Sequence, residues 1–232
     1  FSLALELPYN FLLFKQMQKN LYLNQKFSKF INNKNFEFDR LKILKILNSD
    51  LLEDAYKTIS KWQKYQPTPL ENLSKLSKVL GLKNIFYKDE SKRFGLKSFK
   101  ALGGAYAVEK ITKGRKDITV STATAGNHGK SVAWGARNLE LNCKIFISEN
   151  VSKTRAEEMR NLNAEVIRVK GNYEDSLNFC KEESKKNNWE IIQDVAWPDY
   201  EIVPKLTMAG YSTIIKEISV QTNEYITHIF LQ

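Results

Sequence analysis

From Pro69 onward, strand-length apolar runs alternate with segments of helical spacing. The runs are rich in β-branched residues and occupy 118–122, 144–147, 166–169, 191–195 and 226–231. Between them, apolar residues recur every three or four positions, as on one face of a helix. These stripes are Val132, Ala133, Ala136 and Leu139; Met159 and Leu162; and Ile202, Leu206, Ala209 and Ile214. Strands that alternate with helices predict βαβ units, and therefore an α/β fold with a parallel sheet and helices on both faces.

The segment that precedes this alternation is expected to be helical. Phe27, Phe30 and Ile31 share one helical spacing, and apolar residues share another over 41–47. Pro67 and Pro69 then predict an extended segment, because proline disfavours the helical conformation of the residue before it. Residues 1–60 carry no chemical motif. We therefore predict an N-terminal helical segment that leads into the α/β part of the chain.

The net charge of +10 raises the question of nucleic-acid binding. Of the 36 basic residues, 29 are lysine and 7 are arginine, and the lysines are spread along the whole chain. Base recognition and phosphate binding depend on clustered arginine with interleaved aromatic residues. No such cluster is present in the sequence. The charge is typical of a solvated lysine-rich surface, and we predict no nucleic-acid partner.

Cysteine content and hydropathy limit the class of protein further. Cys143 and Cys180 are too few for a disulfide framework or a zinc site. We therefore expect no metal centre and a reduced, cytoplasmic setting. No stretch approaches the roughly 18 apolar residues that a membrane span needs, so we predict no membrane partner.

Lys100 stands apart from the other lysines because of its neighbours in the sequence. Phe99 precedes it, Ala101 and Leu102 follow it, and the Gly103-Gly104 pair allows a backbone or a flat ligand to approach closely. An amine among apolar groups is held in its neutral form, which is the form that attacks an aldehyde to give a Schiff base. Lys100 is therefore a candidate Schiff-base lysine, against the alternative of a solvated surface charge.

A loop of small and polar residues, 122–130, follows a predicted strand and precedes a predicted helix. Backbone N–H groups and the positive end of the helix dipole would there face an anion, either a carboxylate or a phosphate. Asn127 adds an amide that can orient a ring oxygen. The alternative is an ordinary strand–turn–helix connection with a capping threonine.

Other catalytic templates fail on this sequence. Gly129-Lys130-Ser131 resembles the end of a P-loop, but the glycine that this motif requires five positions earlier is Thr124. The sequence contains no G-x-G-x-x-G and no H-E-x-x-H. Its two histidines, His128 and His228, give little support to a serine or cysteine triad.

Together the two loops resemble those of fold-type-II pyridoxal-phosphate (PLP) enzymes, the group of threonine dehydratase and tryptophan synthase β. Ser98-Phe99-Lys100 is similar to their Schiff-base motif, and residues 125–129 are similar to their asparagine loop. Four further stretches resemble diaminopropionate ammonia-lyase, namely 88–96, 171–175, 193–197 and 208–211. The similarity runs from about Tyr65 to Gln232.

The resemblance implies a role for each matching residue. Lys100 would be catalytic, holding PLP as a Schiff base and serving as the base at Cα, with PLP as the electron sink. Phe99 and Asn127 would also bind the cofactor, Asn127 through the phenolic oxygen. The substrate would be bound by Thr124, Ala125, Gly126 and His128. Asp194, the second catalytic residue, would face the substrate and could pair with a second amino group.

The implied reaction is the elimination of the β-amino group of 2,3-diaminopropionate, which gives pyruvate and ammonia. In diaminopropionate ammonia-lyases the residue before the Gly-Asn-His of the loop is usually an aspartate that acts as acid or base for the D-isomer. Here it is Ala125, which cannot move a proton. The resemblance, with this departure, predicts an L-selective ammonia-lyase.

Two alternatives stay open. Ala125 and the short segment between Ala107 and Thr119 favour a threonine, serine or hydroxyaspartate dehydratase of the same fold, whereas Asp194 and Trp197 favour the ammonia-lyase. The other alternative is an inactive fragment. Relatives hold the PLP phosphate with a glycine-rich loop after a later strand, and a serine or threonine faces the pyridine nitrogen; neither feature is found in this sequence.

The resemblance also implies a domain organisation. Residues 61–116 and 216–232 would belong to the larger PLP domain of a tryptophan synthase β-like fold, and 117–215 would form a smaller α/β domain. The fold is expected to be incomplete, with the chain ending at a core strand over 226–231, and these 232 residues alone are expected to bind PLP weakly or not at all. The full-length enzyme is expected to be a homodimer that acts on a small amino acid.

Overall fold

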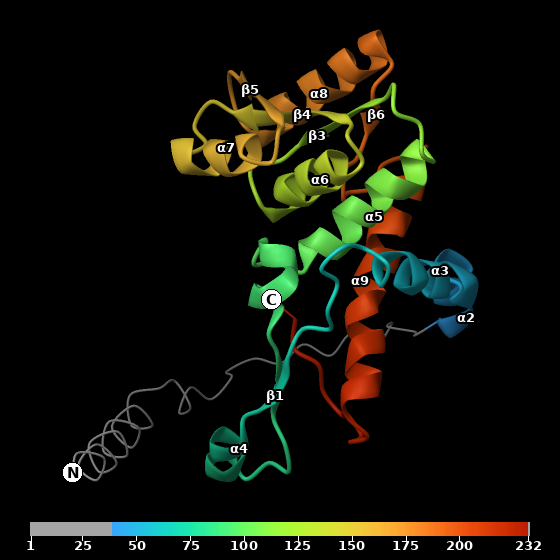
Figure 1. Ribbon diagram of the computed structural model, residues 1–232, viewed down its shortest axis with the longest axis vertical. Helices are drawn as coiled ribbons and strands as arrows, with labels where there is room; N and C mark the ends of the chain where they lie inside the picture. The colour runs from blue at the N-terminus through green and yellow to red at the C-terminus, as the bar shows by residue number, and fades with distance from the viewer. Residues whose placement is uncertain (1–38, 232) are drawn as a thin grey trace, which may run out of the picture. The chain divides into compact units, whose positions relative to one another are not determined.

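The computed structural model describes residues 39–231 (Figure 1). The chain divides into two compact units, Phe1–Asp39 and Arg40–Gln232, and the second contains the helices and strands described below. The helical spacing predicted from Phe27, Phe30 and Ile31 lies outside the described residues.

Helices and strands alternate along most of the described chain. The helices are α2 (Arg40–Ile46), α3 (Ser49–Ile59), α4 (Ser74–Leu80), α5 (Lys100–Thr112), α6 (Asn127–Asn138), α7 (Lys153–Arg160), α8 (Tyr173–Asn187) and α9 (Ile202–Gln221). The strands are β1 (Leu70–Asn72), β2 (Phe86–Lys88), β3 (Thr119–Ala123), β4 (Asn142–Ser148), β5 (Glu165–Val169) and β6 (Glu190–Ile191). A 3-10 helix, η1 (Glu90–Gly95), precedes α5.

A parallel four-stranded sheet carries the larger hydrophobic core. Its strand order is β5-β4-β3-β6, and each neighbouring pair is parallel. Along β4, Ile145 and Ile147 pack with residues of α6 and α7, whereas Phe146 packs with Cys180 of α8. This alternation follows from the two-residue period of a strand. Figure 1 shows α8 on one side of the sheet and α6 and α7 on the other, so the predicted α/β fold with helices on both faces is confirmed.

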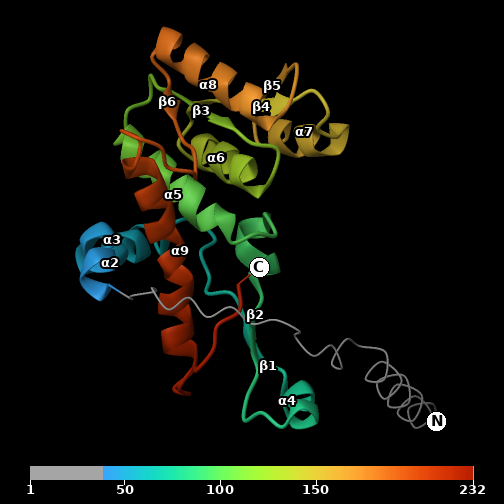
Figure 2. The ribbon, with the colours of Figure 1, turned by 180° about the vertical axis from the view of Figure 1, so that it is seen from behind.

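Glycines bring α5 close to two neighbouring helices. A Cβ atom at Gly104 would lie 2.5 Å from Ser131 Oγ of α6, and a Cβ atom at Gly103 would lie 2.6 Å from the Thr207 carbonyl oxygen of α9. Gly210 of α9 approaches the Leu102 carbonyl oxygen in the same way. Figure 2 shows α5 crossing α9. The sequence predicted that either a backbone or a flat ligand approaches the Gly103-Gly104 pair. In the structure, the groups that approach these glycines belong to the neighbouring helices α6 and α9.

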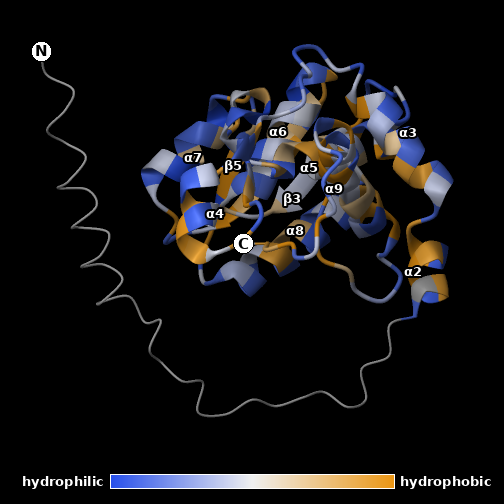
Figure 3. Ribbon diagram, turned by 90° about the horizontal axis from the view of Figure 1, so that it is seen from below, coloured by the Kyte–Doolittle hydropathy of each residue, from blue (hydrophilic) through white to orange (hydrophobic). Residues whose placement is uncertain are grey.

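A second, smaller core joins the N-terminal helices to this layer. Ala55 and Ile59 of α3 are buried with Leu102 and Tyr106 of α5, and Ala209 of α9. Helix α2 contributes less, because its apolar side chains are exposed. Figure 3 shows in orange that many residues of α2 are hydrophobic. The apolar spacing over 41–47 therefore predicts the helix correctly but not its burial.

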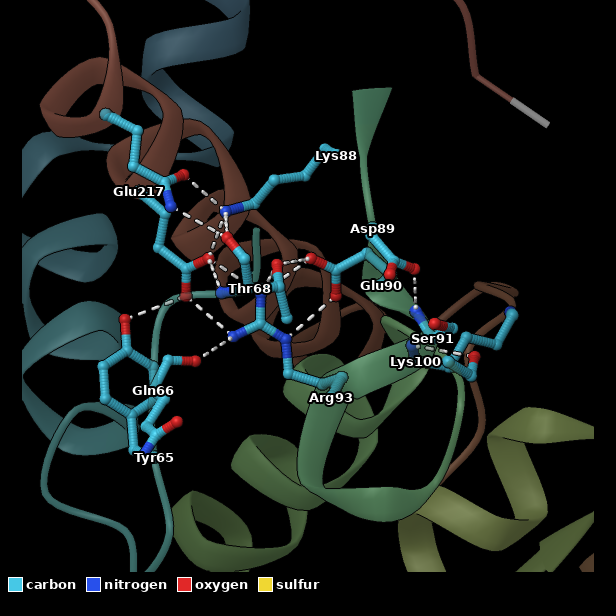
Figure 4. Close-up of polar contacts among 12 residues, drawn as sticks. Tyr65, Gln66, Thr68, Lys88, Asp89, Glu90, Ser91, Arg93, Lys100 and Glu217 are labelled. Carbon is cyan, nitrogen blue, oxygen red and sulfur yellow. Dashed lines mark hydrogen bonds and ion pairs between the residues drawn. The ribbon is translucent and has the colours of Figure 1, made fainter. Parts of the chain in front are cut away.

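A buried ion-pair network ties β2 and η1 to α9 (Figure 4). Arg93, 1% exposed, donates to both carboxylate oxygens of Glu217, at 2.7 and 2.8 Å, and its Nη2 donates to Glu90 Oε1 at 2.7 Å. Lys88 Nζ lies 2.7 Å from Glu217 Oε2 and donates to the Thr68 carbonyl oxygen. Burial alone would raise the pKa of Glu217, but the hydrogen bonds from Arg93 and Lys88 outweigh it and lower that pKa.

The strand predicted at 226–231 is wrong. The segment forms no strand in the described structure, and Ile229, Phe230 and Leu231 are 64%, 92% and 90% exposed. A strand needs a hydrogen-bonded neighbour and at least one buried face, and neither edge of the four-stranded sheet is paired with this segment. An apolar β-branched run alone does not supply these contacts.

The strand predicted at 191–195 is shorter than expected. β6 ends at Ile191, and Val195 is 54% exposed. The reason is that the backbone N–H and C=O of Ala123, at the end of β3, form hydrogen bonds with the side-chain amide of Gln193. They are therefore not available to pair with the backbone of a longer β6. Asp194 consequently lies in a loop just after the sheet edge.

Among the residues that the structure describes, no helix is both long and apolar enough to cross a membrane.

Candidate active site

Lys100 is the first residue of α5, and its ammonium faces a carboxylate. Its Nζ lies 2.7 Å from Asp194 Oδ2, and the Lys100 side chain is 34% exposed. The predicted apolar surroundings of this amine are therefore wrong. Ala101 and Leu102 are buried, but adjacent residues of a helix point in different directions, so their burial does not extend to Lys100 Nζ.

The loop before α6 ends at a helix N-terminus that has no side-chain cap. Gly126 is the N-cap residue, and no side chain there accepts from the first turn. This excludes the capping threonine of the alternative interpretation. Thr124 and Ala125 are half-buried, and Gly126 and Asn127 are exposed. The first-turn N–H groups thus suit an anion, and the predicted carboxylate site at this loop stays a prediction.

Gln193 fixes the loop that carries Asp194, and sequence reasoning did not assign it a role. Its side chain is fully buried and accepts from Thr122 Oγ1 at 2.8 Å. Its Nε2 donates to Tyr173 Oη at the start of α8, also at 2.8 Å. Together with the bonds to Ala123, these contacts join the end of β3, the start of α8 and the Asp194 loop. The sequence feature that could have pointed to Gln193 is its position next to Asp194, in the stretch 193–197.

His128, in the first turn of α6, is buried beside the same carboxylate. Its side chain is 2% exposed, and its Nδ1 lies 3.7 Å from Asp194 Oδ2. Its Nε2 donates to the Ile192 carbonyl oxygen at 2.8 Å. Burial lowers the pKa of His128, the Asp194 carboxylate opposes this shift, and the Lys100 ammonium adds to it.

The charge of Asp194 depends on these two neighbours. Burial alone would raise the pKa of its carboxyl group, but the field of His128 and the hydrogen bond from Lys100 outweigh it and lower that pKa. Asp194 is therefore a carboxylate near neutral pH. The residue before it, Gln193, is held in place by its side-chain hydrogen bonds.

Phe99 packs edge-on against Tyr211 of α9, with ring centroids 5.0 Å apart. Tyr211 Oη is buried and has no hydrogen-bond partner in the described structure. Sequence reasoning did not single out Tyr211 as a site residue, although it ends the stretch 208–211.

The structure thus brings the predicted residues to one edge of the sheet. Lys100, His128 and Asp194 meet around one oxygen atom, and the 124–127 loop follows β3, which is the parallel neighbour of β6. Ligands of open α/β sheets bind at this carboxyl edge. A partly exposed primary amine beside an uncapped helix N-terminus fits PLP, which needs a Schiff-base partner and anion-binding N–H groups. The roles of the individual residues stay predictions.

A model of the pyridoxal-phosphate dependent enzyme family matches residues 61–232. The chain belongs to this family. The match covers both loops and the whole four-stranded sheet, so the family and the cofactor predicted from the motifs are confirmed.

Two curated relatives and one crystal structure define the similarity within the family. Diaminopropionate ammonia-lyase of Escherichia coli strain K12 is 38% identical over 72% of this chain and 48% of its own length. L-threonine dehydratase of Haemophilus influenzae is 31% identical over 72% of this chain and 31% of its own length. The crystal structure of the E. coli ammonia-lyase with an aminoacrylate-PLP azomethine intermediate is 35% identical, with a TM-score of 0.74. That alignment covers 82% of this chain and 52% of the solved chain, so the chain spans about half the length of these ammonia-lyases.

Proposed function

We propose that the full-length protein is a PLP-dependent ammonia-lyase that removes the β-amino group of 2,3-diaminopropionate and yields pyruvate and ammonia. The observation that carries the proposal is the Asp194 carboxylate 2.7 Å from Lys100 Nζ, a place where the site already accommodates an ammonium group. The similarity to the E. coli enzyme named for this activity, solved with an aminoacrylate-PLP azomethine, supports it.

When bound, PLP supplies an electron sink for the negative charge that develops at Cα of the substrate. Lys100 is the residue that would hold the cofactor, and its amine would then take the Cα proton. Phe99 would give the cofactor ring an apolar neighbour, and Asn127 would donate a hydrogen bond to its phenolic oxygen.

Substrate orientation would depend on two oppositely charged ends of the site. The uncapped N-terminus of α6, with the backbone of Thr124, Ala125, Gly126 and His128, would receive the substrate carboxylate. Asp194 would receive the β-amino group as a charge-assisted partner. The two contacts together fix which carbon faces Lys100.

Ala125 is the basis of the proposed preference for the L-isomer. A methyl group cannot accept or deliver a proton, so proton removal depends on Lys100, on one face of the substrate. We expect L-2,3-diaminopropionate to be consumed at least about ten times faster than the D-isomer, which corresponds to about 1.4 kcal/mol in the barrier. Comparable rates for the two isomers would contradict L-selectivity. The matched variant Ala125→Asp should raise turnover of the D-isomer.

A threonine or serine dehydratase is the second candidate, favoured by Ala125 and by the similarity to L-threonine dehydratase. The variant Asp194→Asn separates the two functions. For an ammonia-lyase, loss of the carboxylate removes a hydrogen bond between charged groups, on the order of 1.5–3 kcal/mol, and kcat/KM for diaminopropionate should fall roughly 10- to 100-fold. L-threonine lacks the second amino group, so its kcat/KM should change less. Equal losses for both substrates would contradict the role given to Asp194.

We further propose that the full-length protein is a cytoplasmic homodimer, with residues 61–116 and 216–232 in its larger domain and 117–215 in its smaller one. The free, buried state of Cys143 and Cys180 is in keeping with a reducing compartment. Sedimentation equilibrium of the full-length protein tests the dimer, and a monomer at micromolar concentration would contradict it.

A further inference from the structure

One carboxylate oxygen faces two nitrogen atoms that come from different helices. Asp194 Oδ2 lies 2.7 Å from Lys100 Nζ and 3.7 Å from His128 Nδ1. Lys100 makes the hydrogen bond, and His128 Nδ1 has no partner in the described structure. A buried polar atom without a hydrogen bond costs about 1–3 kcal/mol. The position of this nitrogen therefore needs an explanation.

The protonation of the His128 ring follows from its other nitrogen. Nε2 lies 2.8 Å from the Ile192 carbonyl oxygen, and a carbonyl can only accept, so Nε2 carries a hydrogen. In the neutral ring, Nδ1 is then a bare acceptor that faces a carboxylate oxygen, which is also an acceptor. The contact becomes favourable when Nδ1 gains a proton.

Burial disfavours this proton most, and the Lys100 ammonium adds to the effect. The charged groups that face the ring are Asp194, after β6, and Lys100, at the start of α5. With Lys100 charged and paired, Asp194 is already neutralised and a second cation would be repelled. Under the proposed function, Lys100 Nζ is committed to the cofactor and ceases to be the ammonium partner of Asp194.

We propose that His128 is a positioning residue that serves as a reserve cation for Asp194. One N–H bond of the Lys100 ammonium breaks, its electron pair becomes available for the bond to the cofactor, and an Nδ1–H bond forms on His128 with a proton exchanged through solvent. The three side chains keep the same total charge, and Asp194 stays ionised and oriented. Arrival of the substrate's β-ammonium group then returns the proton to solvent. This inference rests on the proposed function of Lys100.

The variant Lys100→Met tests the proton transfer without cofactor or substrate. Methionine keeps an unbranched apolar side chain and removes the ammonium group. NMR of protein labelled with nitrogen-15 histidine reports the protonation of each ring, and His128→Asn identifies the signal. At pH 6.5, the ordinary midpoint of a histidine, Nδ1 of His128 should be protonated in a larger fraction of the Lys100→Met molecules than of the cofactor-free wild-type molecules. In the double variant Lys100→Met/Asp194→Asn the ring should be neutral again.

A His128 ring that stays neutral in folded Lys100→Met, or stays protonated in the double variant, would overturn the proposal. If Lys100→Met does not fold, the same signal is measured in the wild-type full-length protein before and after addition of PLP. Protonation on addition supports the reserve cation, and an unchanged neutral ring overturns it. Because the variant experiment uses no substrate, its failure leaves the ammonia-lyase activity intact, whereas absent activity with the expected NMR result would contradict the proposed function alone.

Discussion

At the scale of single residues, the ion pair of Lys100 and Asp194 has more effect on charge than on stability. Both side chains are partly exposed, at 34% and 20%, and such pairs contribute only about 0–1 kcal/mol. Together with the field of His128, the same pair nevertheless lowers the pKa of Asp194 against the effect of burial. The ion pair therefore helps to keep the Asp194 carboxylate charged at the place where a cationic group of the substrate would bind.

His128 makes the stability of the cofactor-free protein depend on pH. Burial lowers its pKa, so below pH 6.5 the unfolded chain binds a proton that the folded chain excludes. The free energy of unfolding should be unaffected by His128 well above pH 6.5 and should fall below it, by at most about 1.4 kcal/mol per pH unit. Urea unfolding of the wild type and His128→Gln between pH 7.5 and 5 measures the difference. A slope that is unchanged in the variant would contradict the buried neutral ring. Asp194 does not interfere, because its contribution is lost only below pH 3.8.

At the scale of elements, the close crossing of α5 and α9 depends on glycine. A Cβ atom at Gly210 would lie 2.6 Å from the Leu102 carbonyl oxygen and 2.8 Å from Gly103 Cα, and both are backbone atoms that cannot rotate away. Gly210→Ala should therefore lower the free energy of unfolding by about 1–3 kcal/mol. Gly126→Ala is the matched control, since its Cβ would meet nothing within 4 Å, and it should lower stability by about 1 kcal/mol or less, the cost of alanine at a helix N-cap. Denaturant unfolding that shows equal effects would contradict this packing argument.

The Arg93–Glu217 pair joins η1 to α9 and should matter more than any surface pair. Both side chains are at most 2% exposed. Removal of Arg93 takes away two hydrogen bonds from the buried Glu217 carboxylate, which keeps its ion pair with Lys88, so a cost of about 3 kcal/mol is expected. Arg93→Met should show this loss in urea unfolding. Lys83→Met is the control, because its pair with Glu224 is exposed, at 82% and 41%, and it should cost about 1 kcal/mol or less. A loss for Arg93→Met no larger than the control's would mean that the network does not stabilise the fold.

At the scale of the whole molecule, the four-stranded sheet is predicted better from the sequence than the strand expected at the end of the chain. The strands β3, β4 and β5 and the helices α6, α7 and α9 follow from apolar periodicity, because each must bury one face, whereas no stripe was assigned to α8. The error at 226–231 has the opposite cause: whether an apolar run becomes a strand depends on a neighbour that local pattern does not reveal. The antiparallel pair of β1 and β2 also escaped prediction, since each strand has only three residues.

The site was predictable in its members but not in its contacts. Motif resemblance identified Lys100 and Asp194, and the structure joins them through space across 94 positions of the chain. The ion pair between them and the orphan nitrogen of His128 depend on side-chain directions that no spacing encodes. The structure also gives physical reasons for stretches that resemblance alone singled out: 88–96 contains the buried Arg93, 193–197 begins with Gln193, and 208–211 contains the glycine that admits α5.

The central claim is that Lys100 holds PLP in an enzyme that releases ammonia from diaminopropionate. The most direct test measures pyruvate and ammonia formed from L-2,3-diaminopropionate by the full-length protein and by its Lys100→Ala variant, with the visible absorbance of bound PLP recorded for both. We predict two ammonia molecules per pyruvate for the wild type, and loss of both the products and the absorbance band in the variant. Retention of turnover by Lys100→Ala, or conversion of L-threonine without conversion of diaminopropionate by the wild type, would contradict the account.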